Sequence, residues 1–197
     1  MEPTTIQWAG LNHLALITAD MDTTTRFWHG VLGATLVATI GNDTFRHYFF
    51  DVGHGATVAF FAYHGHAVEP FAKPAGVPDA RAIQFDHVSL NVPDEAALLA
   101  LRQRLLDHGC EVSDVVDHGL MRSIYFTDPN GIALEASWWS QDPTGQSRPS
   151  SNACYQDPAP VAAVQELLAT GTLRHLPATR LVPEPTGDVY QLVSKPA

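Results

Sequence analysis

The sequence predicts an α+β domain in which two copies of a strand–helix–strand–strand–strand (βαβββ) module follow one another over residues 10–140, with an irregular tail over residues 141–197. Three observations predict this fold. The order of strand-like and helix-like segments in residues 10–64 is repeated in residues 84–140. Each copy begins with a strand that carries a histidine near its start, followed by a helix with an acidic start. Each copy leaves one sheet face apolar, so the two should pack together and form a groove between paired sheets.

The first module is expected to contain one strand, one helix and three further strands. Residues 11–18 are mostly apolar and form the first expected strand, with His13 near its start. The acidic residues at 20 and 22 predict a helix start, because carboxylates cap free backbone amides and favour the positive end of the helix dipole. This helix is expected over residues 23–32. The strands that follow are predicted at residues 34–40, 45–52 and 56–63, between glycine-containing turns.

The second module repeats this order. Residues 85–92 form its first expected strand, which carries His87. Residues 93–95, Pro-Asp-Glu, open a helix whose leucines recur at helical spacing. Because the two strand starts match, we expect His13 and His87 to face one another across the groove. The remaining strands are predicted at residues 110–116, 120–127 and 132–138.

The last two strands are joined by a strong turn signal, Asp-Pro-Asn-Gly at residues 128–131. Proline presets φ, and Asn-Gly accepts the positive φ that a tight reversal needs. Folding the chain back at this turn places Tyr125 and Glu135 nearly opposite one another on the same face of the sheet. A carboxylate on an inward face is costly to desolvate unless a positive group is close. We therefore expect a cation beside Glu135.

The overall composition narrows the function classes. The chain has 21 acidic and 11 basic residues and a formal net charge of −10, which argues against nucleic acid or an anionic membrane surface as the partner. We expect no signal peptide, because the first residues lack a basic segment followed by an apolar run, and we expect no segment that spans a bilayer. The two cysteines, Cys110 and Cys154, do not make a disulfide framework. These features predict a cytoplasmic protein that acts on a small molecule.

Two histidines and one carboxylate predict a metal site. His13 and His87 would supply nitrogen ligands and Glu135 an oxygen ligand, which is the facial-triad pattern of non-haem Fe(II) sites. Three protein ligands leave coordination positions open for substrate and dioxygen. Mn²⁺, Co²⁺, Ni²⁺ or Zn²⁺ could bind the same donors, so Fe(II) is the favoured metal among several.

Three motifs resemble a known family. They are Asn-His-Leu-Ala-Leu at residues 12–16, Asp-His-Val-Ser-Leu-Asn-Val at 86–92, and Tyr-Phe-Thr-Asp-Pro-Asn-Gly-Ile-Ala-Leu-Glu at 125–135. At these motifs the chain resembles the vicinal oxygen chelate superfamily, which includes glyoxalases, type I extradiol dioxygenases, fosfomycin-resistance enzymes and bleomycin-binding proteins. The resemblance implies the glyoxalase/dioxygenase-like fold of paired βαβββ modules. It also implies a divalent metal bound by the matching residues, His13, His87 and Glu135.

Within this superfamily, the resemblance favours the extradiol dioxygenases. Tyr125 stands where those enzymes carry a tyrosine that binds the substrate's ring oxygens, and His118 resembles the histidine that precedes it. Glyoxalase-type isomerases use a fourth ligand at the end of the first module, whereas residues 58–62 here offer none. The resemblance thus implies a non-haem Fe(II) extradiol-type dioxygenase that acts on an aromatic or catechol-like small molecule.

The proton-transfer group and the pocket wall are less closely defined. The acid–base histidine of the ring-cleaving enzymes would fall at Ala56, so this role is left to His54, to His118 or to neither. A group of aromatic side chains in the first module is expected to wall an aromatic pocket. It comprises Phe45, Tyr48, Phe50, Phe60 and Phe61.

Alternative functions and assemblies remain open. A glyoxalase-like metal-dependent lyase or isomerase, or a thiol transferase, would use the same fold. A metal-free antibiotic-binding protein of the bleomycin-binding type would not need the three ligands. We expect a homodimer, in which the two modules could pair within one chain or between chains. In the tail, residues 142–160 read as a linker and residues 160–169 as a short helix, and no chemistry is assigned to either.

Overall fold

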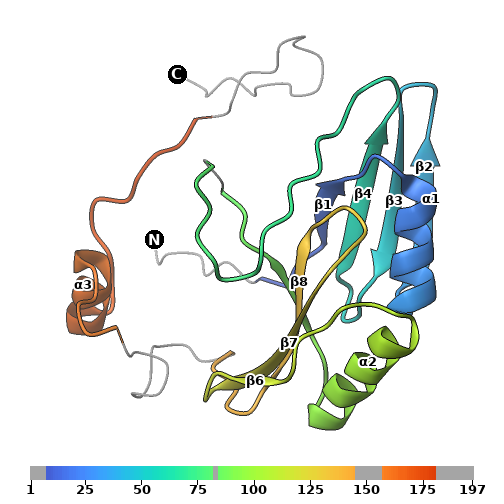
Figure 1. The fold of residues 1–197 in the computed structure, drawn as a ribbon. Coiled ribbons are helices and arrows are strands. Elements are labelled where there is room, and N and C mark those ends of the chain that lie inside the picture. Colours follow the sequence, from blue (N-terminus) through green and yellow to red (C-terminus); the bar gives the residue numbers. More distant parts are fainter. Residues whose placement is uncertain (1–7, 82–83, 145–156, 181–197) are drawn as a thin grey trace. The chain divides into compact units, whose positions relative to one another are not determined.

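The computed structural model describes residues 8–81, 84–144 and 157–180. The chain divides into two compact units, residues 1–142 and residues 143–197. The first unit contains the two modules, each built as a four-stranded sheet with a helical segment after its first strand (Figure 1). The predicted repeat of two βαβββ modules is therefore confirmed.

The first module forms a mixed sheet in the order β1-β4-β3-β2, in which β1 pairs parallel with β4 and the other pairs are antiparallel. The predicted helix start is correct, because the Asp20 side chain accepts a hydrogen bond from the Thr23 backbone N–H. The helix continues without a break from α-helical into π-helical turns. The elements are β1 (His13–Ile17), α1 (Met21–Thr25), η1 (Arg26–Val31), β2 (Thr35–Gly41), β3 (Phe45–Asp51) and β4 (Thr57–Tyr63).

The second module has the same topology, with strand order β5-β8-β7-β6. Its edge strand is shorter than predicted. In residues 110–116, Ser113 runs beside Tyr125, but the Ser113 hydroxyl, not a carbonyl, accepts from the Tyr125 backbone N–H, so no regular ladder forms until residue 116. The elements are β5 (Val88–Asn91), α2 (Glu95–Asp107), β6 (Val116–Asp117), β7 (Met121–Thr127) and β8 (Ala133–Trp139).

One apolar core runs through both modules. Trp28 is fully buried and its ring contacts those of Phe50 and Phe60, and the cluster continues into leucines of the second module. Phe50 and Phe60 therefore cannot wall a pocket, and Tyr48 packs against the same core. The expected aromatic wall is wrong for Phe50 and Phe60, because alternation along β3 and β4 turns them toward the helix. Tyr48 points to the same side and lines a cleft of about 690 Å³ beside α1.

Side-chain hydrogen bonds also join the modules. The turn between β7 and β8 reaches the start of the first helix, where Asn130 bonds to the hydroxyls of Thr18 and Thr24. The indole N–H of Trp28 donates to Asp128 at 3.3 Å. At the other end of that helix, Arg104 of α2 donates to backbone carbonyls of residues 30 and 31. The Asp-Pro-Asn-Gly turn thus also fastens one module to the other.

The second unit contains one described helix, α3 (Ala162–Thr170). It ends where Gly171 adopts the left-handed conformation with φ of 72°, which agrees with the short helix predicted there. Cys154 lies outside the described residues, and Cys110 is a free thiol. Within the described part of the chain, no helix is long and apolar enough to cross a membrane.

Candidate metal and substrate site

The second module brings two of the predicted ligands together. Strand β8 pairs with β5 and β7, and this register places Glu135 beside Ser89 on one side and Tyr125 on the other. Nε2 of His87, just before β5, lies 3.0 Å from Oε2 of Glu135. The predicted placement of Tyr125 opposite Glu135 is confirmed.

The His87–Glu135 contact favours a positive charge between its two atoms. Nδ1 of His87 lies 2.5 Å from Oδ1 of Asp86, and a carboxylate can only accept there, so Nδ1 carries a proton. In a neutral imidazole, Nε2 would then present a lone pair to the Glu135 carboxylate. Two acceptors facing one another at 3.0 Å repel, and a proton or a metal ion between them removes the repulsion. The pair therefore has the chemistry of two metal ligands.

The Glu135 carboxylate is held ionised although it is 5% exposed. Burial alone would raise its pKa, but surrounding hydroxyls outweigh burial and lower the pKa of Glu135 below its ordinary value. In decreasing order, these hydroxyls belong to Ser123, Tyr125, Ser89 and Ser137. A buried anion with such a pKa is suited to binding a cation.

Tyr125 and His118 form a second pair beside the first. The Tyr125 hydroxyl and Nε2 of His118 are hydrogen-bonded at 2.7 Å, and the Tyr125 ring meets the ring of His87 edge-on at 6.4 Å. Burial, followed by the Glu135 carboxylate, raises the pKa of Tyr125 to about 12. The phenol therefore remains a hydrogen-bond donor at neutral pH. The structure thus joins the two predicted catalytic residues and places Tyr125 next to the His87–Glu135 pair.

His13 does not join this pair. Its Nδ1 donates to Oδ1 of Asn12 at 2.7 Å, and its ring contacts those of His47 and Phe49. Among the residues that the structure describes, no three His, Cys, Asp or Glu side chains lie close enough together to hold a metal ion. His54 lies in an exposed turn with φ of 51°, before β4. The three-ligand set thus stays a prediction.

Two of the three predicted ligands, His87 and Glu135, have a separation that suits a divalent metal. Two ligand atoms on neighbouring corners of an octahedron with bonds of about 2.1 Å lie about 3.0 Å apart. The separation of Nε2 of His87 from Oε2 of Glu135 is 3.0 Å. In both modules the side chain before the histidine holds Nδ1, which leaves Nε2 as the ligand atom: Asn12 holds His13, and Asp86 holds His87.

His47 of β3, whose ring contacts that of His13, is a candidate site residue that the sequence did not reveal. It is 8% exposed, and its Nε2 is buried without a hydrogen-bond partner in the described part of the chain. Its ring stacks on Phe61 at 3.5 Å between centroids and lies 4.2 Å from Phe49. Burial, and then the neighbouring His13, lowers the pKa of His47. Alternation along β3 could have placed His47 on the same face as Phe45 and Phe49. That His47 is buried with an unpaired nitrogen could not be predicted, because no sequence motif indicates burial.

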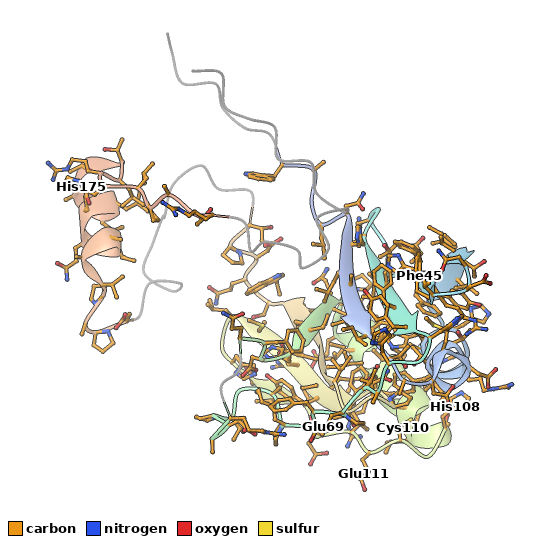
Figure 2. The ribbon with its side chains drawn as sticks, turned by 90° about the horizontal axis from the view of Figure 1, so that it is seen from above. Phe45, Glu69, His108, Cys110, Glu111 and His175 are labelled. Atoms are coloured by element: carbon orange, nitrogen blue, oxygen red, sulfur yellow. The ribbon has the colours of Figure 1, made fainter. Side chains whose placement is uncertain are left out.

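A cleft of about 690 Å³ lies beside Tyr125, between β7 and the connector that joins the modules. Connector residues 72–75 form one side, and residues 111–113 after α2 form part of the rim. Glu111 is one of these rim residues, and Figure 2 shows its side chain pointing outward (Figure 2). The opening is large enough for a small organic molecule.

A family model described as Glyoxalase: Glyoxalase/Bleomycin resistance protein/Dioxygenase superfamily matches residues 10–136. No curated protein matches the chain. Among solved structures, a glyoxylase/bleomycin resistance protein/dioxygenase domain from Frankia sp. EAN1pec is similar, with a TM-score of 0.58 and 22% identity over 68% of this chain and 99% of that chain.

Two other solved structures share the fold. TnmS3, an antibiotic binding protein from Streptomyces sp. CB03234, has a TM-score of 0.53 and 14% identity, and the match covers 69% of this chain and 100% of that chain. SMU.1112c has a TM-score of 0.52 and 24% identity, over 66% of this chain and 99% of that chain. At these identities the likeness establishes the architecture of the first unit and leaves the chemistry to its own residues.

Proposed function

The chain belongs to the Glyoxalase/Bleomycin resistance protein/Dioxygenase superfamily, and from this membership we propose that it is a divalent-metal enzyme of the extradiol dioxygenase type. Its substrate would be an aromatic or catechol-like small molecule, and Fe(II) is the favoured metal. The superfamily contains metal-dependent enzymes and also proteins that only bind small molecules, so the proposal depends on the residues of this site.

The observation that carries the proposal is the contact between His87 and Glu135 beside the hydrogen-bonded Tyr125–His118 pair. His87 and Glu135 would hold the metal, with His13 as the third ligand. When bound, the metal supplies a positive charge that holds two reactants together and stabilises developing negative charge. Tyr125 would donate a hydrogen bond to a substrate oxygen and so orient the substrate. His118 would orient the Tyr125 hydroxyl through their hydrogen bond or protonate the substrate.

Metal binding is the first test. We expect Fe(II) or a substitute divalent ion to bind the wild-type protein and to be lost in His87→Ala and Glu135→Gln. His108→Ala, at the exposed end of α2, is the matched control and should bind metal normally. Oxygen uptake with Fe(II) and a panel of catechols then tests the reaction. Metal binding without oxygen uptake would favour a lyase or isomerase over a dioxygenase.

A metal-free binding protein is the second candidate, and an aromatic strip on the first module favours it. On the face of the sheet that carries His13, ring contacts of 3.5–5.5 Å run from Phe49 through His47 and Phe61 to Phe45 and Tyr63. Such a surface can stack a planar ligand. Undiminished ligand binding after removal of all divalent metal would support this candidate and exclude the enzyme.

We also propose that the protein works as a homodimer in which the partner completes the metal site. The modules share a core on their helix sides, and the face that carries His13 leaves Ile17 and Ile40 51% and 53% exposed. His13 and the His87–Glu135 pair are separate half-sites in the described part of one chain. A second copy could place its own pair opposite His13, so that an isologous dimer forms two complete sites.

Mixing two defective variants tests this assembly. His13→Ala and Glu135→Ala should each bind no metal. After subunit exchange in an equal mixture, pairing between chains predicts that each mixed dimer regains one intact site, or about one quarter of the wild-type sites. Pairing within one chain predicts that none return. The metal content of the mixture therefore decides between the two arrangements.

A further inference from the structure

The connector between the modules contains a buried lysine. Lys73 is 7% exposed, which is unusual for lysine. Its ammonium donates three hydrogen bonds: to the carbonyls of Pro74 at 3.0 Å and Val77 at 3.3 Å, and to Oδ2 of Asp86 at 2.7 Å. An ammonium has three donors, so all of them are used. The connector thus buries the Lys73 ammonium and holds it against the Asp86 carboxylate.

Asp86 is held at both of its oxygens. Oδ2 accepts from Lys73, while Oδ1 accepts from the Gly76 backbone N–H at 2.8 Å and from Nδ1 of His87 at 2.5 Å. The carboxylate therefore cannot turn away from the imidazole without breaking contacts to the connector. An unbroken series of contacts runs from Lys73 through Asp86 and His87 to Glu135.

We propose that Lys73 and Asp86 are positioning residues that hold the His87 imidazole with its Nδ1 proton toward Asp86 and its Nε2 toward Glu135. Through them, the fold of the connector and the binding of a metal at His87 reinforce each other. The first statement concerns the metal-free protein and stands by itself, whereas the second rests on the proposed metal site.

The first module supplies an internal contrast. At the position that matches Asp86 it has Asn12, a neutral amide, which accepts from Nδ1 of His13 at 2.7 Å. A carboxylate that accepts from a ligating imidazole makes that imidazole a stronger electron donor, and a neutral amide does so less. Because Asp86 is an anion held by a buried cation, His87 should be the stronger of the two histidine ligands. Both modules thus orient their imidazole through Nδ1, but only in the second module is the group that accepts from Nδ1 charged.

The contacts could instead serve only to fasten the connector, and the tautomer of His87 separates these roles. Imidazole nitrogen shifts, measured by nuclear magnetic resonance on the metal-free protein at alkaline pH, report which nitrogen carries the proton. We expect Nδ1 in the wild type. Asp86→Ala should move the proton largely to Nε2, because Glu135 is then the carboxylate left to accept from the ring. A wild-type tautomer in Asp86→Ala would overturn the proposal.

Metal affinity tests the coupling. Lys73→Met keeps the length of the side chain but removes the charge, and it should weaken divalent metal binding about 10- to 100-fold, as expected for a group that acts through a ligand. Asp79→Asn is the matched control: Asp79 forms an ion pair with Arg81 in the same connector and has no contact with His87. It should bind metal as the wild type does.

Four outcomes are distinguishable. Loss of affinity in Lys73→Met but not in Asp79→Asn supports the coupling. Equal affinity in Lys73→Met and wild type overturns it, as does an equal loss in both variants, which would mean that any damage to the connector disturbs the site. If the wild type binds no divalent metal, the proposed function fails, while the tautomer measurement still decides whether Asp86 positions His87.

Discussion

Replacing His47 by phenylalanine should stabilise the metal-free protein. The buried Nε2 of His47 has no hydrogen-bond partner in the described part of the chain, and an unpaired buried polar group costs about 1–3 kcal/mol. Phenylalanine can keep the stacking on Phe61 at 3.5 Å and the contact with Phe49 at 4.2 Å, and its larger ring costs about 1 kcal/mol in crowding. We expect a net gain of about 1 kcal/mol, or a rise in Tm of about 2–4 °C.

The gain should depend on pH. Burial lowers the pKa of His47 from its ordinary value of 6.5, so the unfolded chain takes up a proton at a higher pH than the folded one. The stability that His47 contributes as a neutral group is present above pH 6.5 and is lost as the pH falls through the folded-state pKa. His47→Phe does not titrate there. Its advantage over the wild type should therefore grow as the pH is lowered below 6.5.

Chemical denaturation at several pH values, with Tm as a second measure, checks both statements. His108→Phe is the control, since this exposed histidine should change stability by less than about 0.5 kcal/mol. A folded His47→Phe protein that is less stable than wild type by more than about 1 kcal/mol would refute the reasoning, because it would mean that Nε2 makes a favourable bond. An advantage that does not change with pH would refute the assigned shift in pKa.

Three further predictions concern the second module. In Tyr125→Phe, the tyrosine step near pH 12 in an ultraviolet pH titration should disappear, and an unchanged titration would contradict the assigned pKa. Because the folded-state pKa of Tyr125 is raised from 10.0 to about 12, the contribution of its neutral phenol to stability is present below pH 10 and is lost as the pH rises through 12. Gly131→Ala should destabilise the protein by about 1–3 kcal/mol, because φ is 79° and the new Cβ would lie 2.9 Å from Cβ of Ala72; Ala72→Gly should restore only the steric part, and denaturation curves that match wild type would exclude the strain. Asn130→Ala should cost about 1–3 kcal/mol in thermal unfolding by leaving the buried Thr18 hydroxyl with fewer partners, and strictly additive effects with Thr18→Ala would show that the two residues are not coupled.

Local patterns predicted the architecture well. The repeat of two modules, the acidic helix starts and the turn at residues 128–131 depend on interactions within a few residues, so they can be read along the chain. The register that places Tyr125 opposite Glu135 also follows from that turn, because alternation leaves only one way to fold the strands back. The same alternation, applied to β3 and β4, would have excluded Phe50 and Phe60 from the pocket wall.

The residues that act through distant contacts escaped prediction. Lys73 is an ordinary lysine in a proline- and glycine-rich connector until the fold buries it against Asp86, 13 residues later. His47 becomes a candidate only because packing against Phe61 removes water from its ring and leaves one nitrogen unpaired. Burial and orphaned hydrogen-bonding groups are properties of three-dimensional packing, and no spacing in the chain encodes them.

The sequence by itself determined the repeated topology, the identity of the candidate ligands and the hairpin that presents Glu135. Turns, helix caps and strand alternation depend on residues that are close together in the sequence. Tertiary structure alone decided which ligands meet: it joined His87 to Glu135 at 3.0 Å and left His13 among the rings of His47 and Phe49. The physical reason is that the two modules share one apolar core, so the side chains that pack in it determine where each sheet face lies. This packing involves side chains from both modules at once.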